Sequence, residues 1–362
     1  MKVDNKIKII FAAQFSDPIN GMILINRLFF HHIASTNSYE IIKFDLGNGS
    51  PASIKKLVLR LKPIFKLCYY LVSNYKRKNC TIFYLSVSHA AGMYFEFIPW
   101  VISSKFVNLR IMHHHTYKYI NKKSCLMQVM QKNKNTKNIF LCEHQQIHFN
   151  NLYKKSNSYL NDYILSNFFY FQFLNKNSLS HHLKPCGPQI QIGFLSNLQI
   201  EKGIFELFEI VRIFKNDTRV NFSIVGPVHD KKIFKLLKEF DGYSNFSYSG
   251  PLYGHDKSKW FEKIDIFLFP SHFDSFPLVL MEAMFYGSIA LSTNVGCIPN
   301  LNLQEFIFNK ENYVESVINF INSFLVSNEF RDLAKSKNRN YFNEIFNNSL
   351  NIDSDIIEIF KI

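Results

Sequence analysis

Short hydrophobic runs, rich in β-branched and aromatic residues, alternate with helix-like stretches along the whole chain. In the first half the runs predict strands at residues 6–13, 39–46, 81–85, 106–112, 138–142 and 162–165. In the second half they predict strands at 189–195, 220–225, 245–248, 264–269 and 289–292, separated by helices such as 203–215, 231–240 and 278–286. Such alternation is typical of parallel sheets covered by helices on both faces. The sequence therefore predicts an α/β protein.

Two such blocks meet at a polar stretch, 171–188, whose central part is NKNSLSHHLKPCGP. We interpret this stretch as a linker between two doubly wound, Rossmann-like domains that face each other across a cleft. The first domain spans 1–172 and regains the C-terminal helix, 345–362, and the second spans 185–344. Ligands of such sheets bind beyond the carboxyl ends of the strands, so the functional residues should follow strands.

Composition supports a folded protein and adds an asymmetry of charge. The chain has 362 residues, 47% of them hydrophobic and 19% charged, which excludes a disordered chain. Residues 1–180 contain 24 Lys and Arg against 7 Asp and Glu, whereas 181–362 contain 18 against 21, and these balances of +17 and −3 give the net charge of +14. The basic excess of the first half favours an anionic partner, either a membrane surface or nucleic acid.

Two stretches of the first half, 51–80 and 97–141, contain no acidic residue. The first predicts a basic, partly amphipathic helix interrupted at Pro63, a type that can lie in a lipid interface. The alternative is an ordinary solvated face of a lysine-rich protein. No stretch reaches the roughly 20 uninterrupted apolar residues of a membrane span, and the N-terminus lacks a secretory signal. We therefore expect a soluble protein that binds membranes peripherally.

The clearest motif runs from 269 to 287, FPSHFDSFPLVLMEAMFYG. A predicted strand ends at Phe269, Asp274 follows in a turn, and a helix starting near Leu278 carries Glu282. The free N–H groups and the dipole of a helix N-terminus can hold an anion, and carboxylates beside it can accept hydrogen bonds from sugar or ribose hydroxyls. On spacing alone, a loop aspartate and a surface glutamate explain the pair equally well.

Other candidates also follow predicted strands. Lys202 and Gly203 open a helix after the strand at 189–195, where a phosphate would gain a charge and backbone N–H groups. Gly226 follows the next strand, and Gly250, Pro251 and Leu252 follow the one after that. Residues of these types, in this order and all at strand ends, make a specific ensemble.

This ensemble resembles the retaining glycosyltransferases of the GT-B fold, family 4. The usual motif of that family is E-x7-E, followed by a small-residue turn and a segment like TDVGGIPE. The corresponding residues here are Asp274 and Glu282, Gly287, and the segment STNVGCIPN at 292–300. The likeness covers nearly the whole chain and is strongest from 190 to 300.

The resemblance implies roles for individual residues. Lys202 would bind the donor diphosphate, and Asn197 stands where the family usually has a second cation, so it would hydrogen-bond phosphate instead. Glu282 would accept hydrogen bonds from the ribose, and Asp274 would contact the donor sugar or the developing charge. The remaining donor contacts are expected from the main chain of Phe276, Pro277, Leu278 and Val279, where every residue except the proline has an N–H group to donate, and from the base-bracketing loop at Gly250 and Leu252.

Two features of the first half match the family as well. Gly21, in the loop after the first strand, resembles the family's glycine beside the donor diphosphate, although a helix-start glycine explains it equally well. The run RIMHHHTY at 110–117 ends a strand with three histidines, and His115 aligns best with the family's histidine near the donor sugar, with His113 and His114 as alternatives. Adjacent strand residues point to opposite sides, so the three cannot converge on a metal ion.

The resemblance implies an enzyme, a hexosyltransferase that retains the anomeric configuration and needs no metal or other cofactor. Its donor would be a UDP- or GDP-sugar. Its acceptor would be a saccharide attached to a polyprenyl diphosphate lipid, in the biosynthesis of a bacterial surface polysaccharide such as O-antigen, lipopolysaccharide, capsule or exopolysaccharide. The basic half would hold the protein at the cytoplasmic, inner face of the cell membrane. The alternatives are an epimerase or phosphorylase on the same fold and a non-catalytic nucleic-acid-binding protein. Because no nucleic-acid motif is present, we do not expect nucleic acid as a partner.

Overall fold

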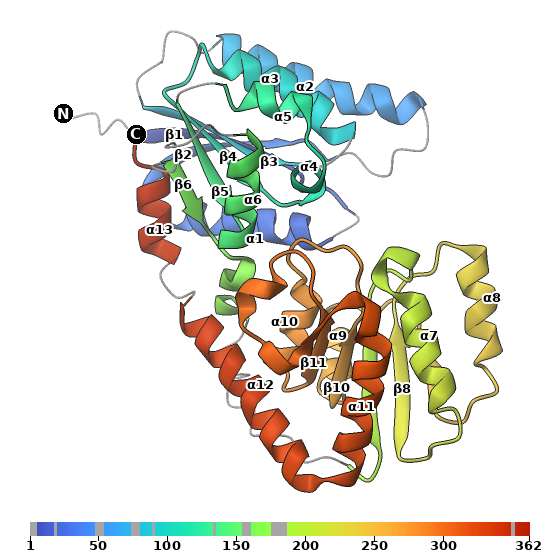
Figure 1. The fold of residues 1–362 in the computed structure, drawn as a ribbon. Coiled ribbons are helices and arrows are strands. Elements are labelled where there is room, and N and C mark those ends of the chain that lie inside the picture. Colours follow the sequence, from blue (N-terminus) through green and yellow to red (C-terminus); the bar gives the residue numbers. More distant parts are fainter. Residues whose placement is uncertain are drawn as a thin grey trace. The chain divides into compact units, whose positions relative to one another are not determined.

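The computed structural model describes residues 6–17, 20–47, 54–73, 80–88, 91–132, 135–153, 161–174, 187–348 and 352–362. The chain divides into two compact units, one formed by Met1–Tyr170 with Asn351–Ile362 and the other by Phe171–Leu350 (Figure 1). The expected boundaries were 172 and 185 between the domains and 345 for the return of the chain. Most of the expected linker, 175–186, lies outside the described residues.

The first unit is built on a six-stranded, wholly parallel sheet in the order β2-β1-β3-β4-β5-β6. Its strands are β1 (Ile7–Ala13), β2 (Tyr39–Asp45), β3 (Thr81–Val87), β4 (Leu109–His114), β5 (Thr136–Phe140) and β6 (Asp162–Ile164). Its helices are α1 (Gly21–Ser35), α2 (Ile54–Ser73), α3 (Ala91–Ser103), α4 (Lys118–Asn121), α5 (Cys125–Met130), α6 (Glu143–Tyr153) and α13 (Ile352–Ile359).

Helices cover both faces of this sheet. Phe83 and Tyr84 are neighbours on β3 and therefore point to opposite faces. Phe83 packs against Trp100 of α3, and Tyr84 stacks on Phe360, the residue that follows α13. Every residue of β3 and β4 is buried, as expected for central strands of a parallel sheet.

The C-terminal helix α13 returns to the first unit, as the sequence predicted. Lys137 on β5 donates hydrogen bonds to the main-chain oxygens of Glu358, Ile359 and Lys361, at 3.0, 3.1 and 2.8 Å. A lysine is a favourable partner for the last carbonyls of a helix, which have no partner within the helix. These bonds and the aromatic contacts of Phe360 fix the helix to the sheet.

The second unit is also a six-stranded parallel sheet, in the order β12-β11-β10-β7-β8-β9. Its strands are β7 (Ile190–Leu195), β8 (Val220–Val225), β9 (Phe246–Tyr248), β10 (Ile266–Phe269), β11 (Ile289–Thr293) and β12 (Ile307–Phe308). Its helices are α7 (Ile204–Ile213), α8 (Lys231–Glu239), α9 (Gly254–Phe261), α10 (Leu278–Phe285), α11 (Tyr313–Val326) and α12 (Asn328–Asn348). Two doubly wound sheets with flanking helices confirm the predicted fold class.

Three local expectations were wrong. The helix α2 continues through Pro63 instead of breaking there. An internal proline costs about 3 kcal/mol, and the buried inner stripe of Ile64, Leu67 and Leu71 offsets that cost. The strand β4 lies two to three residues later than predicted because its histidines, though polar, are buried within the sheet. The two-residue strand β12 was not foreseen, since so short a run carries no periodic pattern.

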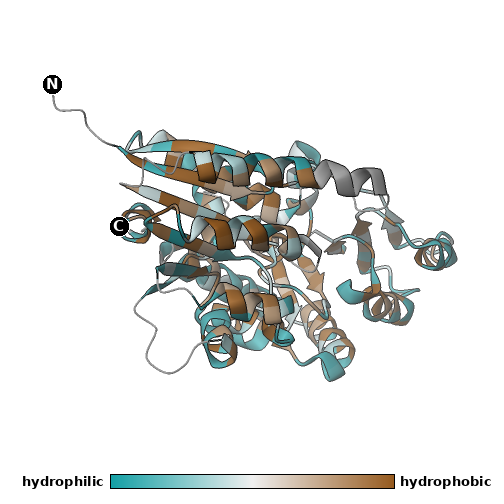
Figure 2. Cartoon of the chain, turned by 90° about the horizontal axis from the view of Figure 1, so that it is seen from above, coloured by the Kyte–Doolittle hydropathy of each residue, from teal (hydrophilic) through white to brown (hydrophobic). Residues whose placement is uncertain are grey.

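Large hydrophobic side chains lie next to lysines on the outer face of α2 and α3. Phe65 and Tyr69 of α2 are 68% and 75% exposed, and Tyr94 of α3 is 66% exposed. These three define the α2–α3 surface, together with the exposed residues Lys62, Lys66, Val72, Ile98, Val101 and Lys105. The view of Figure 2 shows hydrophobic segments along both helices. Among the described residues, no helix combines the length and apolar character needed to cross a membrane.

Candidate functional site

The strands β7 and β10 are neighbours at the centre of the second sheet, at the point where the strand order reverses. The connection after β7 leads to β8 on one side, and the connection after β10 leads to β11 on the other. In doubly wound sheets such a reversal is the place where ligands bind, beyond the carboxyl ends of the two strands. Lys202 follows β7 and Asp274 follows β10, so the predicted residues lie at this switch point.

The loops after β7 and β10 are docked directly on each other. The N–H of His272 donates to the main-chain oxygen of Glu201 at 2.9 Å. Gly203 has a φ of +75°, and a Cβ at this position would lie 2.0 Å from the main-chain oxygen of Pro270. The turn that carries Lys202 can approach the second loop this closely because residue 203 has no side chain.

Lys202 and Asp274 form an ion pair across these loops. The Nζ of Lys202 lies 2.6 Å from Oδ2 of Asp274 and 3.3 Å from the main-chain oxygen of Phe273, to which it also donates. The other carboxylate oxygen of Asp274 accepts from the N–H of Ser275 at 2.8 Å. Both side chains are about one-fifth exposed, so the pair lies at the border of solvent, where a ligand can reach it.

A third turn supports Asp274 from behind. Gly296, within the segment similar to TDVGGIPE, has a φ of +58°. A Cβ there would lie 2.3 Å from the main-chain oxygen of Asp274, and the next residue, Cys297, donates its N–H to the oxygen of Ser275 at 3.0 Å. The glycine of this segment therefore allows a turn to hold the loop that carries Asp274.

Glu282 lies on the second turn of α10 and is 6% exposed. Lys257 of α9 donates to both of its carboxylate oxygens, at 2.8 and 2.6 Å. Sequence reasoning missed Lys257, because the contact arises from the packing of α9 beside α10 and no motif marks it.

The helix α10 begins after Pro277 without a side-chain cap. Of the other residues predicted to contact the donor here, Phe276, Pro277 and Leu278 are buried and Val279 is half-buried.

A second pair that sequence reasoning missed joins α7 to the loop after β10. The Nε2 of His272 lies 2.5 Å from Oε1 of Glu206, which belongs to the first turn of α7. This contact and the backbone bond of His272 to Glu201 tie the two loops of the switch point together at both ends.

The remaining predicted residues of the second unit lie on neighbouring loops. Gly226 donates its N–H to the main-chain oxygen of Gly250 at 2.9 Å, which joins the loops after β8 and β9. Gly250 has a φ of +69°, and Leu252 beside it is half-buried. Asn197 is exposed on the loop after β7. The predicted donor residues of the second unit thus all lie at the carboxyl edge or on α10 beside it.

The histidine run of the first unit alternates across the sheet, as predicted. His113 and His115 share one face, with ring centroids 4.0 Å apart, and His114 lies on the other, stacked on Phe140 at 4.7 Å. His114 bonds to the hydroxyl of Tyr119 and the amide of Asn138, at 2.8 and 3.1 Å, which indicates a structural role. Among the described residues, no three His, Cys, Asp or Glu side chains gather closely enough to hold a metal ion.

His115 differs from its neighbours because neither ring nitrogen has a hydrogen-bond partner, although the residue is only 9% exposed. Burial lowers its pKa from 6.5 to about 3. Burial also lowers the pKa of His113 well below 6.5, and the Nδ1 of this ring bonds to the hydroxyl of Tyr84 at 2.7 Å. The rings of His113 and His115 are therefore neutral near pH 7 and can exchange hydrogen bonds without adding charge.

Gly21 is the first residue of α1 and is exposed. The preceding Asn20 caps the helix, accepting the N–H of Ile23 at 3.0 Å. Gly21 therefore lies at a helix start, which was the alternative explanation for this glycine. The helix follows the carboxyl end of β1.

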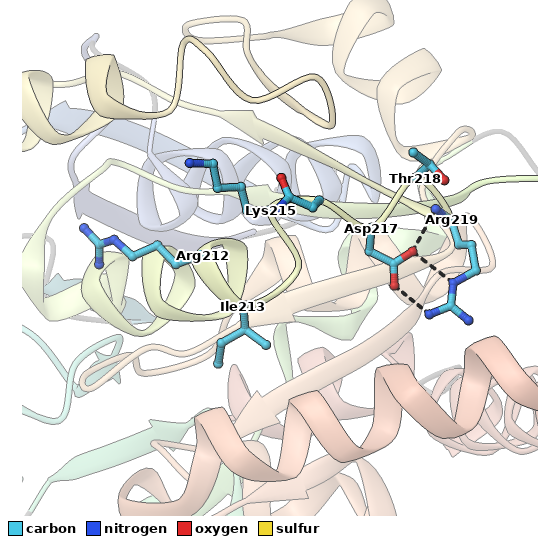
Figure 3. Close-up of a pocket in the computed structure, with 7 residues that line it drawn as sticks. Arg212, Ile213, Lys215, Asp217, Thr218 and Arg219 are labelled. Carbon is cyan, nitrogen blue, oxygen red and sulfur yellow. Dashed lines mark hydrogen bonds and ion pairs between the residues drawn. The ribbon is translucent and has the colours of Figure 1, made fainter.

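A separate pocket of about 460 Å³ lies where α7 ends and β8 begins, and so at the amino edge of the second sheet (Figure 3). Arg219 and Asp217 of its lining pair with each other, with Nε and Nη2 of the arginine 2.9 and 2.7 Å from the two carboxylate oxygens. This pocket lies at the opposite end of the strands from Lys202 and Asp274 and contains none of the predicted residues.

Residues 178–341 match the family described as Glycosyl transferases group 1. The matched segment contains Lys202, Asp274, Glu282 and the supporting glycines 203 and 296. The second unit therefore carries the sequence pattern of group 1 glycosyl transferases.

One relative by sequence is an uncharacterized 41.2 kDa protein in the cps region of Klebsiella pneumoniae, 28% identical over 114 residues. The alignment covers 31% of this chain and 30% of that protein, so it spans less than a third of either.

Sucrose-phosphate synthase from Thermosynechococcus elongatus has a similar structure, with a TM-score of 0.71, 12% identity and coverage of 98% and 99% of the two chains. Anabaena HepE, solved in complex with UDP and glucose, has a TM-score of 0.66, 12% identity and coverage of 97% and 100%. The GT-B fold inferred from the motifs is confirmed.

The close approach at Gly203 can be tested by mutation. Gly203→Ala adds a Cβ 2.0 Å from a main-chain oxygen, whereas Gly287→Ala, at a φ of +86°, has nothing within 4 Å. Both variants lose about 1–2 kcal/mol from the left-handed backbone, and only Gly203→Ala adds an overpacking cost of about 1–3 kcal/mol. Urea unfolding should therefore find Gly203→Ala less stable than Gly287→Ala, and equal stabilities would contradict the docking of the two loops.

The buried histidines predict a loss of stability in acid. The unfolded chain protonates His115 near pH 6.5 and the folded chain only near 3, so the unfolded state binds more protons between these values. Stability should fall as the pH drops from about 6.5 toward 3, by up to about 1.4 kcal/mol per pH unit for each buried histidine. In His115→Asn this slope, measured by urea unfolding from pH 6.5 to 4, should be smaller. The exposed His229 provides the control, since His229→Asn should keep the slope of the wild type.

Proposed function

We propose that this protein is a retaining glycosyltransferase that moves a sugar from a nucleoside diphosphate sugar to a saccharide acceptor. The observation that carries the proposal is the arrangement at the switch point, where a lysine and an aspartate pair at 2.6 Å beside the uncapped N-terminus of a helix that carries a second, buried carboxylate. Cations and free backbone N–H groups suit a diphosphate, and carboxylates suit sugar hydroxyls.

In this proposal the donor replaces the contacts that the protein makes with itself. The diphosphate attracts Lys202 away from Asp274, which leaves the aspartate free to accept hydrogen bonds from the donor sugar. Glu282 accepts from the ribose, and the N–H groups at the start of α10 face the phosphates. Asn197, exposed on the loop after β7, offers a neutral amide to the diphosphate.

The same groups would serve the chemical step. As the bond between the sugar and the diphosphate breaks, negative charge grows on the departing oxygen, and Lys202 with the positive end of α10 stabilises it. The acceptor hydroxyl attacks from the face that the diphosphate leaves and gives its proton to an oxygen of the departing phosphate, so the anomeric configuration is retained. His115, neutral near pH 7, would exchange a hydrogen bond with a donor sugar hydroxyl. Because these groups supply the positive charge, we assign no metal or cofactor to the step. We further propose that the chain is a hexosyltransferase of family 4.

The comparisons support particular substrates. HepE was solved with UDP and glucose, which favours a UDP-sugar as donor, with a GDP-sugar as the second choice. The relative encoded in a cps region favours the biosynthesis of a bacterial surface polysaccharide. We propose a lipid-linked saccharide as acceptor, held by the first unit, and the second unit as the donor-binding domain.

The basic first unit also supports a place at the membrane. On α2, the α2–α3 surface presents the rings of Phe65 and Tyr69 beside Lys62 and Lys66, within a stretch that contains no acidic residue. Aromatic and aliphatic groups enter the interface of a bilayer, and lysines are attracted to anionic headgroups. We propose that this surface binds the anionic inner leaflet from the cytoplasm and so brings the enzyme to a lipid-linked acceptor.

The donor site predicts the pattern of nucleotide binding. Calorimetry with UDP, GDP, ADP and CMP should find one diphosphate that binds the wild type. Lys202→Met and Glu282→Gln should each weaken it about 10- to 100-fold, the range expected for a hydrogen bond to a charged group. Lys235→Met, which removes an exposed lysine of α8, should bind as the wild type does. If Lys202→Met and Glu282→Gln both bind the nucleotide as tightly as the wild type does, the assignment of the site is wrong.

The α2–α3 surface predicts binding to anionic vesicles. The wild type should sediment with vesicles that contain phosphatidylglycerol, less so at high salt, and not with pure phosphatidylcholine. The double variant Phe65→Ser, Tyr69→Ser should lose most of this binding, because about 1–3 kcal/mol per buried side chain is removed. The matched control is Phe234→Ser, Val326→Ser, which changes two exposed hydrophobic residues of the second unit. If the control loses as much binding, the surface is wrongly assigned.

A further inference from the structure

Lys257 is the residue of the site that neither the motifs nor the proposed mechanism accounts for. Its Nζ donates to both oxygens of Glu282, at 2.8 and 2.6 Å. The two residues come from different helices, α9 and α10, and a second set of contacts holds these helices together. Tyr286 donates to the hydroxyl of Ser258 at 2.9 Å and stacks on Phe261 with a ring distance of 5.8 Å. The ion pair is therefore built into the packing of the two helices.

The environment of the pair distinguishes it from a structural ion pair. At the amino edge of the same sheet, Lys335 and Asp265 pair at 3.5 Å with side chains only 5% and 3% exposed. At the carboxyl edge, the side chain of Glu282 is 7% exposed but that of Lys257 is 24% exposed. Lys257 also lies only five residues beyond Leu252, on the first helix after the loop proposed to bracket the base. The pair thus lies where a nucleoside would be bound.

A carboxylate oxygen can accept more than one hydrogen bond, so an ionised Glu282 paired with Lys257 can still accept from hydroxyl donors. Without Lys257, the carboxylate would lose the two hydrogen bonds that fix the direction of its oxygens. Hydroxyls of a ribose are donors that need a fixed, charged acceptor to be recognised strongly.

We propose that Lys257 is a positioning residue for recognition of the nucleotide. It holds the carboxylate of Glu282 in the orientation that accepts hydrogen bonds from the ribose hydroxyls. The inference rests on the proposed function and deepens it, because it assigns the selection of ribose to a lysine–glutamate pair. The diphosphate contact, through Lys202, does not depend on Lys257.

The test compares nucleotides that lack either the ribose hydroxyls, assigned to Lys257 through Glu282, or the second phosphate, assigned to Lys202. Calorimetry uses the diphosphate that the wild type binds, UDP or GDP, with its 2′,3′-dideoxy counterpart and its monophosphate. In the wild type, the loss of the ribose hydroxyls should weaken binding about 10- to 100-fold. In Lys257→Met this ratio should fall to within about threefold, whereas the ratio between diphosphate and monophosphate should stay as in the wild type.

Three measurements separate this role from a loss of structure. Lys257→Arg keeps a cation able to contact both oxygens and should restore ribose discrimination at least in part. Lys259→Met removes an exposed lysine from the same helix and should leave the ratio unchanged. The thermal unfolding midpoint shows whether each variant is folded.

The outcomes are distinct. A folded Lys257→Met variant that still discriminates against the dideoxy nucleotide as the wild type does would overturn the inference and leave the proposed function intact. A wild type that binds no nucleoside diphosphate would end the proposed function, and the inference with it.

Discussion

The contact between the turn at Gly203 and the main chain of Pro270 sets the geometry of the candidate site. It brings together two loops that are about 70 residues apart in the chain and that follow neighbouring strands. The backbone bond between Glu201 and His272 and the side-chain contact between Glu206 and His272 lie on either side of it. Lys202 and Asp274 can pair only because this approach is closer than any residue with a Cβ allows.

The two units meet the cost of polar groups at strand ends in different ways. In the second unit, charged groups at the switch point are paired, Lys202 with Asp274 and Lys257 with Glu282. In the first unit, the hydroxyls of Ser86 and Ser88 and both nitrogens of His115 are buried without partners. Each such group costs about 1–3 kcal/mol, which the burial of the hydrophobic side chains of the sheet must offset. Both arrangements occur at the carboxyl edge, where parallel sheets bind ligands.

Most of the fold could be predicted from the sequence. Strands of a buried parallel sheet are continuous hydrophobic runs, rich in β-branched and aromatic residues, and such runs are easily recognised. The positions of Lys202 and Asp274 could be predicted for the same reason, since each follows such a run. The strand β4 was displaced in the prediction because three histidines resemble a loop until burial shows otherwise. Lys257 could not be found, because it lies 25 residues before its partner and meets it through the packing of two helices. The return of α13 to the first unit was foreseen, but the returning helix was expected to start at 345 and not at Ile352, since helix ends depend on caps and tertiary contacts.

The short outer strands of both sheets bear on how the chain behaves beside other copies of itself. An exposed sheet edge offers unpaired N–H and C=O groups to any extended strand, which promotes aggregation. Among the described strands, three of the four sheet edges are formed by β6, β9 and β12, which have only two or three residues each. The fourth edge, β2, has seven residues, but exposes the charged Glu40 and Lys43. Although 47% of its residues are hydrophobic, the chain therefore offers few sheet edges on which a strand of another molecule could pair.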